Sequence, residues 1–179
     1  IYENCKEDEE LEVFKLPKFI NTLMENNWLG SKSGQGFYKK IKGENGKNKI
    51  LGLDLETLEY RSGKKANFPT LELTKSVDLV IDRFKILVAG KDKAGEFYRK
   101  SFALMFAYVS KRIPEISEEL YKIDDAMKAG FGWENGPYEI WDAIGVEKGI
   151  ELIKEVGKEP AFWVNDMLAS EIKSFYTVK

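Results

Sequence analysis

The stretch that decides the fold is Ile123–Gly145, IDDAMKAGFGWENGPYEIWDAIG, where glycines and a proline alternate with tryptophans and carboxylates. Its first part has apolar residues at helical spacing, so it predicts the end of an amphipathic helix that stops near Gly130. Asn135-Gly136-Pro137 predicts a turn, and Pro137 suits the first turn of a second helix that ends at Gly145. So much glycine between aromatic residues indicates backbone packed closely in a helix–turn–helix corner, or against a ligand.

The same stretch carries a family resemblance. It resembles a segment of the C-terminal helical region of 3-hydroxyacyl-CoA dehydrogenases, of the form D-x-A-M-x-x-G-F-G-W-E-x-G-P-[FY]-E-x-W-D-A-[IL]-G, and we place the match from Asp125 to Gly145. The residues that we assign to this structural signature are Asp125, Gly130, Gly132, Trp133, Gly136, Pro137, Trp141, Asp142 and Gly145.

The carboxylates of the signature allow two interpretations. Paired carboxylates suggest acid–base chemistry, which Asp125, Glu134, Glu139 and Asp142 could provide. However, Glu139 and Asp142 flank a helix that starts at a proline, and a helix N-terminus favours negative charge. We therefore expect structural roles, with Asp125 tying the corner together by hydrogen bonds.

A second glycine-rich stretch, Trp28–Lys40, reads WLGSKSGQGFYKK. Its glycines do not fit the spacing of a phosphate-binding loop or of a dinucleotide-binding turn. It resembles a second signature of the same family, W-L-G-x-K-[ST]-G-x-G-F-Y, which closes the first helical repeat there. From this resemblance we expect Lys32 to meet a CoA phosphate, and we name as candidate substrate-binding residues Lys32, Ser33, Gly34 and Gly36.

The composition excludes several classes of protein. The chain has no histidine, which removes histidine-based triads and histidine-ligated metals, and the single Cys5 excludes an internal disulfide. A net charge of −2 gives no electrostatic footprint for nucleic acid. The uncharged run in residues 101–110 is too short to cross a membrane, and we expect a cytoplasmic location.

The periodicity predicts a mainly α fold, a helical bundle like the C-terminal domain of these dehydrogenases, with a small β-hairpin in a linker. The hairpin strands are expected at Phe37–Ile41 and Lys49–Leu53, joined through the Asn-Gly turn in Glu44–Lys47, and Thr57–Arg61 as a further extended piece. The linker is expected to end near Ser62-Gly63-Lys64-Lys65. Helices are expected at 16–28, from Thr70 to Gly90, after Lys93, and at 116–127, 146–156 and 160–172.

Two segments match each other. Pro17-Lys18-Phe19 and Pro160-Ala161-Phe162 each precede an amphipathic helix, and Phe37-Tyr38 and Phe175-Tyr176 follow it. With the resemblance, this indicates residues 1–41 as the tail of a first helical repeat, 42–67 as a linker and 68–179 as a second helical domain. The counterpart of Ile123–Gly145 in the first repeat is then expected upstream of Ile1.

In the family, an N-terminal domain binds NAD, a histidine acts as base and the helical part shapes the acyl-CoA site. None of the catalytic residues can be placed on this chain, so we assign no catalytic, cofactor-binding or metal residues, and we expect the isolated chain to be inactive. The resemblance implies as partners a nucleotide-binding domain of the same polypeptide, an acyl-CoA substrate and further copies of the chain. It also allows a bifunctional member with an enoyl-CoA hydratase domain. The alternative is a stand-alone helical interaction module that retains the scaffold without the chemistry.

Overall fold

The computed structural model describes residues 2–43, 45–63 and 66–177, and the chain divides into two compact units, Ile1–Ala66 and Asn67–Lys179. We call them unit 1 and unit 2, and each is described by itself. The division into a repeat tail, a linker and a second domain stays a prediction. Glu44, in the expected hairpin turn, and Lys64-Lys65, at the expected end of the linker, lie outside the described residues.

Unit 1 combines short helices with a small antiparallel sheet. Two short 3₁₀ helices, Leu11–Phe14 and Ser31–Ser33, lie on either side of α1 (Lys18–Glu25). The strands β1 (Tyr38–Lys42), β2 (Asn48–Leu53) and β3 (Tyr60–Ser62) follow in the order β1-β2-β3. The two expected hairpin strands are confirmed, and the expected extended piece forms a third strand slightly later in the chain.

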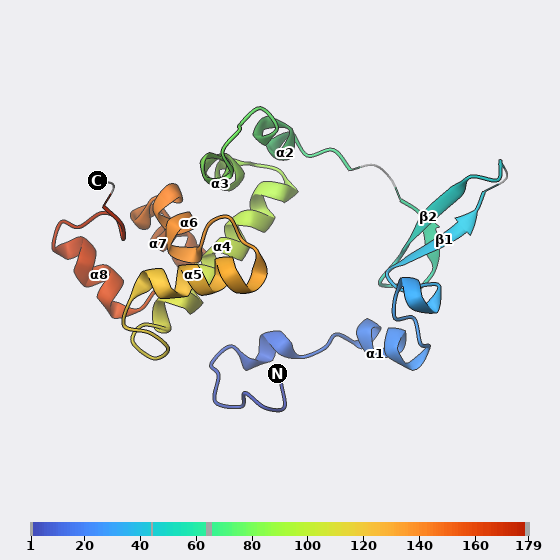
Figure 1. Ribbon diagram of the computed structural model, residues 1–179, viewed down its shortest axis with the longest axis horizontal. Helices are drawn as coiled ribbons and strands as arrows, with labels where there is room; N and C mark the ends of the chain where they lie inside the picture. The colour runs from blue at the N-terminus through green and yellow to red at the C-terminus, as the bar shows by residue number, and fades with distance from the viewer. Residues whose placement is uncertain (1, 44, 64–65, 178–179) are drawn as a thin grey trace. The chain divides into compact units, whose positions relative to one another are not determined.

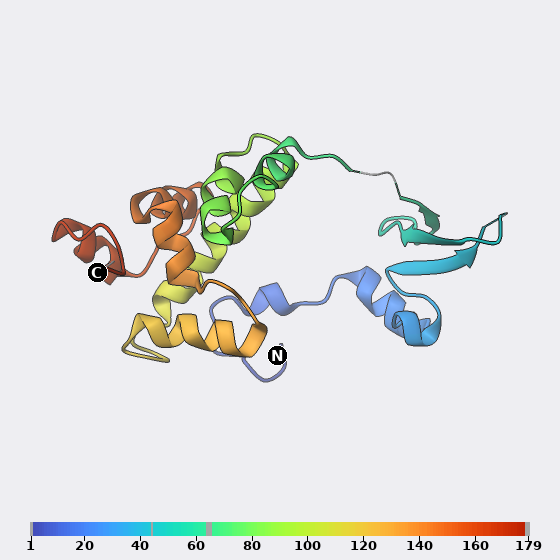
Figure 2. The same ribbon diagram turned by 45° about the horizontal axis from the view of Figure 1, so that its top comes forward.

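Figures 1 and 2 show the strands of unit 1 beside its short helices. Aromatic side chains connect the sheet region to the helical part of the unit. The Trp28 and Tyr60 ring centroids are 5.7 Å apart, and Phe19 of α1 meets Phe37 edge to face at 6.3 Å. The Tyr60 hydroxyl donates to the carbonyl oxygen of Gly36 at 2.6 Å. The strands expected in a linker are therefore part of a compact unit.

Unit 2 is built around its longest helix, α4 (Lys93–Lys111), as Figure 2 shows. The helices α3 (Val80–Ala89), α6 (Pro137–Ile144) and α7 (Val146–Glu155) pack against it. The remaining helices are α2 (Pro69–Thr74), α5 (Leu120–Phe131) and α8 (Phe162–Ala169). The expected mainly α fold with a small β element is confirmed.

Within the described ranges, none of the helices is both long and apolar enough to cross a membrane. The apolar run at residues 101–110 lies inside α4, whose Phe102, Ala103 and Phe106 are buried in the core of unit 2. This agrees with the expected buried helix.

One expected helix is wrong in extent. The apolar stripe from Thr70 to Gly90 predicts one helix, but the structure has α2 and α3 with a break between Thr74 and Val80. The Thr74 hydroxyl donates to the carbonyl of Leu71 at 2.8 Å, and Arg83 Nε donates to the carbonyl of Val77 at 2.8 Å. Side-chain bonds of this kind compete with the helical ladder, which the apolar periodicity does not reveal.

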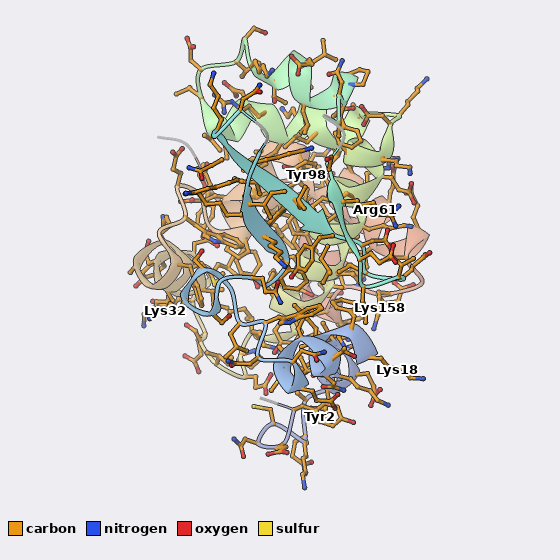
Figure 3. The ribbon with its side chains drawn as sticks, turned by 90° about the vertical axis from the view of Figure 1, so that its right-hand side faces the viewer. Tyr2, Lys18, Lys32, Arg61, Tyr98 and Lys158 are labelled. Carbon is orange, nitrogen blue, oxygen red and sulfur yellow. The ribbon has the colours of Figure 1, made fainter. Side chains whose placement is uncertain are left out.

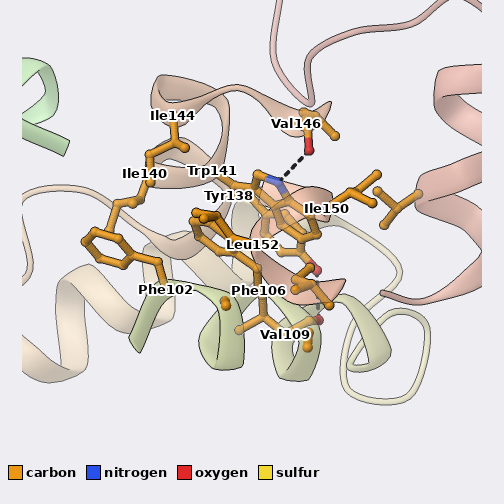
Figure 4. Packing of buried hydrophobic residues seen from close by; sticks show 14 of the residues in the cluster. Phe102, Phe106, Val109, Tyr138, Ile140, Trp141, Ile144, Val146, Ile150 and Leu152 are labelled. Atoms are coloured by element: carbon orange, nitrogen blue, oxygen red, sulfur yellow. Dashed lines mark hydrogen bonds between the residues drawn. The ribbon is translucent and has the colours of Figure 1, made fainter. Parts of the chain in front are cut away.

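The core of unit 2 is a stack of aromatic rings (Figure 4). Phe102, Phe106 and Trp141 stack in sequence, and the last two ring centroids are 4.7 Å apart at an interplanar angle of 10°. The indole N–H of Trp141 donates to the carbonyl oxygen of Val146 at 3.1 Å, so its polar group is satisfied. A Cβ atom at Gly149 would lie 1.9 Å from Trp141 Nε1, so only glycine lets α7 approach this ring.

Candidate functional site

The signature stretch forms the expected helix–turn–helix corner. Helix α5 ends at Phe131, Gly132 caps it, and α6 begins at Pro137. A Cβ atom at Gly136 would lie 2.2 Å from Cβ of Asp124, so the start of α6 packs directly onto α5. Gly145 joins α6 to α7, whereas Gly130 is exposed and has open space around it. The absence of a side chain at Gly136 therefore allows α6 to pack closely on α5.

The corner is held by Asp124, whose side chain is 1% exposed. Its carboxylate accepts hydrogen bonds from the backbone N–H groups of Tyr138 at 2.9 Å and Glu139 at 3.1 Å. It also accepts from the hydroxyl of Tyr176 at 2.8 Å. These donors include the first turn of α6, so this carboxylate satisfies amides that the helix itself cannot pair.

The expected role of Asp125 is therefore wrong, and the correct residue is its neighbour. Asp125 is exposed and forms an ion pair with Lys128 at 3.1 Å. Counting back from Ala126-Met127, the aspartate of the D-x-A-M pattern falls on Asp124. The sequence pattern therefore identifies Asp124, one position before the aspartate that we assigned.

Burial raises the pKa of the Asp124 carboxyl, and the three hydrogen bonds act in the opposite direction. Burial also raises the pKa of the Tyr176 hydroxyl, and its hydrogen bond to Asp124 adds to this effect. The tyrosine therefore stays protonated and acts as a donor to the carboxylate.

Glu139 has a second structural role at the start of α6. Its Oε2 accepts from the backbone N–H of Gly136 at 2.8 Å, and its Oε1 pairs with Lys128 at 2.8 Å. The hydrogen bonds that the Lys128 ammonium donates to Glu139 and Asp125 raise the pKa of Lys128. The expectation of negative charge at this helix N-terminus agrees with this arrangement.

Asp142 holds the segment that follows α8. Its Oδ1 accepts from the backbone N–H of Phe175 at 2.8 Å, and its Oδ2 from that of Tyr176 at 2.9 Å. The ring of Phe175 packs edge to face on Tyr138 and Trp141, at 5.1 Å from each. Burial raises the pKa of Asp142, and the two backbone hydrogen bonds act against this.

These contacts define what we call the socket, formed by Asp124, Tyr138, Trp141 and Asp142. The tongue that fills it is Phe175-Tyr176. Sequence reasoning missed the socket, because the two ends of the Tyr176–Asp124 bond are 52 residues apart.

Replacing Asp142 with alanine is expected to release the tongue, because two backbone N–H groups lose their acceptor. We expect the free energy of unfolding of unit 2 to fall by about 2 kcal/mol. Limited proteolysis with mass spectrometry should show faster cleavage after residue 170, and urea denaturation gives the free energy. Asp166→Ala, at an exposed aspartate in α8, is the control and should leave both unchanged. A tongue as resistant in the Asp142 variant as in the natural chain would contradict this role.

The chemistry of the corner is structural. The carboxylates of the buried Asp124 and the partly buried Asp142 accept hydrogen bonds from donors that belong to the fold, and the chain has no histidine to share a proton with them. Among the residues that the structure describes, no three histidine, cysteine or acidic side chains are grouped so that they could hold a metal ion. These hydrogen bonds fix the start of α6 and the segment that follows α8.

The second signature lies in unit 1 and is described within that unit. The Ser33 hydroxyl accepts from the N–H of Leu29 at 2.9 Å and lies within hydrogen-bond distance of the Gln35 carbonyl at 3.1 Å. Gly36 is buried and approaches Gly30, since a Cβ there would lie 2.8 Å from its Cα. Ser33 and Gly36 close the loop on itself.

The other two candidates in this loop are exposed. Gly34 follows the short helix Ser31–Ser33 as its C-cap. The side chain of Lys32 is exposed on that helix (Figure 3). The substrate-binding role assigned to this loop stays a prediction.

Unit 2 also has an open apolar groove of about 870 Å³ between α4 and α5. Its lining includes Met105, Val109, Ile123, Met127 and Trp133. The lining residues come from α4, from α5, from the segments before and after α5 and from the start of α6, so no single periodicity in the sequence points to the groove. Its chemistry suits an apolar group.

Sequence comparison with known proteins identifies relatives of this chain. It is 38% identical over 176 residues, 98% of its length, to a protein of Bacillus subtilis (strain 168) named as a probable 3-hydroxyacyl-CoA dehydrogenase. This chain is a relative of the 3-hydroxyacyl-CoA dehydrogenases. The family resemblance drawn from the two signatures is thus confirmed.

A second relative extends this result. A protein of Rickettsia prowazekii (strain Madrid E), named as a candidate trifunctional enzyme of a fatty acid oxidation complex, is 26% identical over 148 residues, 83% of the chain. The chain spans about a fifth of the length of these curated relatives, 22% of the Bacillus protein and 19% of the Rickettsia protein. No protein-family model and no solved structure matches it.

Proposed function

We propose that this chain is the C-terminal helical region of an NAD-dependent 3-hydroxyacyl-CoA dehydrogenase, which oxidises 3-hydroxyacyl-CoA to 3-oxoacyl-CoA in fatty acid β-oxidation. In this proposal the chain shapes the acyl-CoA pocket and supplies an assembly surface. The observation that carries it is the use of the signature residues: Gly136, Asp142 and Trp141 are all engaged in packing or backbone hydrogen bonds. A scaffold role explains why these residue types stand at these positions.

The catalytic apparatus belongs elsewhere in the polypeptide under this proposal. The chain has no histidine to act as base, and its glycines do not have the spacing that a dinucleotide-binding turn requires. Its residues therefore do not fit NAD, and the coenzyme is assigned to a nucleotide-binding domain in the rest of the protein. The share of the relatives' length that the chain covers leaves room for such a domain.

The apolar groove between α4 and α5 supports the assembly part of the proposal. Ile116 on its lining is 70% exposed, and Trp133 is 37% exposed. Apolar area of this kind gains stability when another apolar surface covers it. A cytoplasmic location and self-association belong to the same proposal.

The test compares two proteins, the full-length gene product and the chain of residues 1–179. We expect the full-length protein to reduce NAD with a 3-hydroxyacyl-CoA substrate, measured by the absorbance of NADH, and the 179-residue chain to give no rate above background. A full-length protein without activity over a series of acyl chain lengths would favour the stand-alone interaction module. Activity in the 179-residue chain alone would contradict the assignment of the base to another domain.

A further inference from the structure

The β1–β2 hairpin of unit 1 concentrates positive charge. Its stretch KKIKGENGKNKI, residues 39–50, follows the second signature and carries five lysines and one glutamate, whereas the whole chain has a net charge of −2. Figures 1 and 2 show the two strands extending away from α1. Four of the five lysines are exposed, namely Lys40, Lys42, Lys47 and Lys49. The hairpin is therefore a strongly basic surface on a chain that is slightly acidic overall.

The two faces of the hairpin have different surroundings. Side chains alternate along a strand, so Lys39 and Tyr60 share one face, where the Lys39 ammonium lies 5.4 Å from the centroid of the Tyr60 ring. The same tyrosine packs on Trp28, so this face is turned toward the helical part of unit 1. The opposite face, which we call the outer face, carries Lys40, Lys42, Asn48 and Ile50.

The outer face combines positive charge with exposed apolar area. Ile50 is 65% exposed, with Lys40 directly opposite it in the register and Lys42 on the diagonal. Neither lysine forms an ion pair with a residue that the structure describes, whereas Arg61, which follows on the same side of the sheet, is paired with Asp54. An aliphatic side chain between cations gains little from an anion in water, but it gains from contact with an apolar phase that has an anionic surface.

The lysines do not converge on one small anion. A single bound phosphate is held by donors that point into one concave site, such as successive backbone N–H groups. Here the exposed ammonium groups are point charges on flexible side chains, distributed over both faces and beyond the turn of the hairpin. This distribution suits a surface that carries many negative groups.

We propose that the outer face of the hairpin, together with Lys47 after its turn, is a peripheral docking surface for a membrane of anionic phospholipids. The ammonium groups of Lys40, Lys42 and Lys47 approach the lipid phosphates, and each strengthens binding by about fivefold. Ile50 enters the boundary between the headgroups and the acyl chains, as apolar side chains of interfacial segments do. The contact needs no membrane-spanning helix, and the inference does not depend on the proposed dehydrogenase function.

The test measures co-sedimentation of the 179-residue chain with vesicles of phosphatidylcholine alone and with vesicles in which about a third of the lipid is phosphatidylglycerol. We expect binding to the second kind only, and we expect it to weaken as salt rises, because salt screens the lysines. Lys40→Glu combined with Lys42→Glu keeps the edge strand charged, and so protected from aggregation, but reverses the sign of the charge. The affinity of this variant for the anionic vesicles should fall by at least about twentyfold.

The matched control is Lys91→Glu combined with Lys154→Glu, at two exposed lysines of unit 2. It changes the net charge of the chain by the same amount, and we expect the affinity to change by less than about twofold, because screened charges act only at short range. An equal loss of affinity in the two double variants overturns the inference, as does a natural chain that stays in the supernatant with the anionic vesicles.

Ile50→Thr distinguishes a membrane from other polyanions. Threonine keeps the strand preference of the position, and far-UV circular dichroism checks that each variant is folded. We expect this variant to bind the anionic vesicles about threefold more weakly with an unchanged salt dependence, because only apolar contact is lost. A single-stranded oligonucleotide that binds as tightly as the vesicles, with no effect of Ile50→Thr on either partner, would assign the outer face to nucleic acid and overturn the inference.

Discussion

Replacing Asp124 with alanine is expected to lower the free energy of unfolding of unit 2 by about 3–5 kcal/mol, the range found when one member of a buried polar network is removed. The variant leaves two backbone N–H groups, those of Tyr138 and Glu139, and the Tyr176 hydroxyl without their acceptor. The N–H of Tyr138 lies in the interior, where water cannot replace the carboxylate, and Gly136 packs against the same side chain. Urea denaturation followed by far-UV circular dichroism measures the loss.

The neighbouring residue provides a matched control. Asp125→Ala removes the same side chain one position away, at an exposed ion pair, and is expected to change the free energy by less than about 1 kcal/mol. Asp124→Asn should lie between the two, because its amide keeps one carbonyl acceptor but directs an NH₂ group toward a donor. Equal losses for the two alanine variants would show that the corner does not depend on Asp124.

Replacing Trp141 with alanine is expected to cost about 3–5 kcal/mol and leave unit 2 without a stable core. The indole is fully buried, stacks on Phe106 and carries the edge of Phe175. Alanine would leave a cavity where three helices and the tongue converge, and no neighbour of that size is free to fill it.

The control is the other tryptophan of the signature. Trp133 is 37% exposed on the rim of the groove, so Trp133→Ala should cost about 1 kcal/mol or less. Near-UV circular dichroism and the urea midpoint distinguish the two variants. A Trp141 variant with a midpoint near that of the Trp133 variant would contradict the packing described for the ring stack.

Local patterns identify much of this fold. The turn at Asn135-Gly136-Pro137, the restart at Pro137 and the Asn-Gly hairpin were all predictable, because each depends on the conformational preference of adjacent residues. The break between α2 and α3 was not, since it arises where hydroxyl and guanidinium groups compete for backbone carbonyls inside an apolar stripe.

The candidate site was less accessible to sequence reasoning. The signature pointed to the right corner, but we assigned its aspartate to Asp125, whereas the D-x-A-M spacing places it at Asp124. The partnership of Asp142 with Phe175 and Tyr176 depends on chain segments more than 30 residues apart, 33 and 34 positions respectively. Such pairing is set by tertiary packing, which no local pattern encodes.

The dependence of the socket on Tyr176 has a consequence for synthesis. A ribosome releases the chain from its first residue to its last, so Asp124, Tyr138 and Trp141 emerge long before the tongue that completes them. Until residue 176 has left the ribosome, the nascent unit holds a desolvated carboxylate short of a donor and an aromatic surface open to water. Truncated chains that end before Phe175-Tyr176 keep this aromatic surface exposed, so chaperones and proteases can act on them. Chains that include the tongue bury the surface.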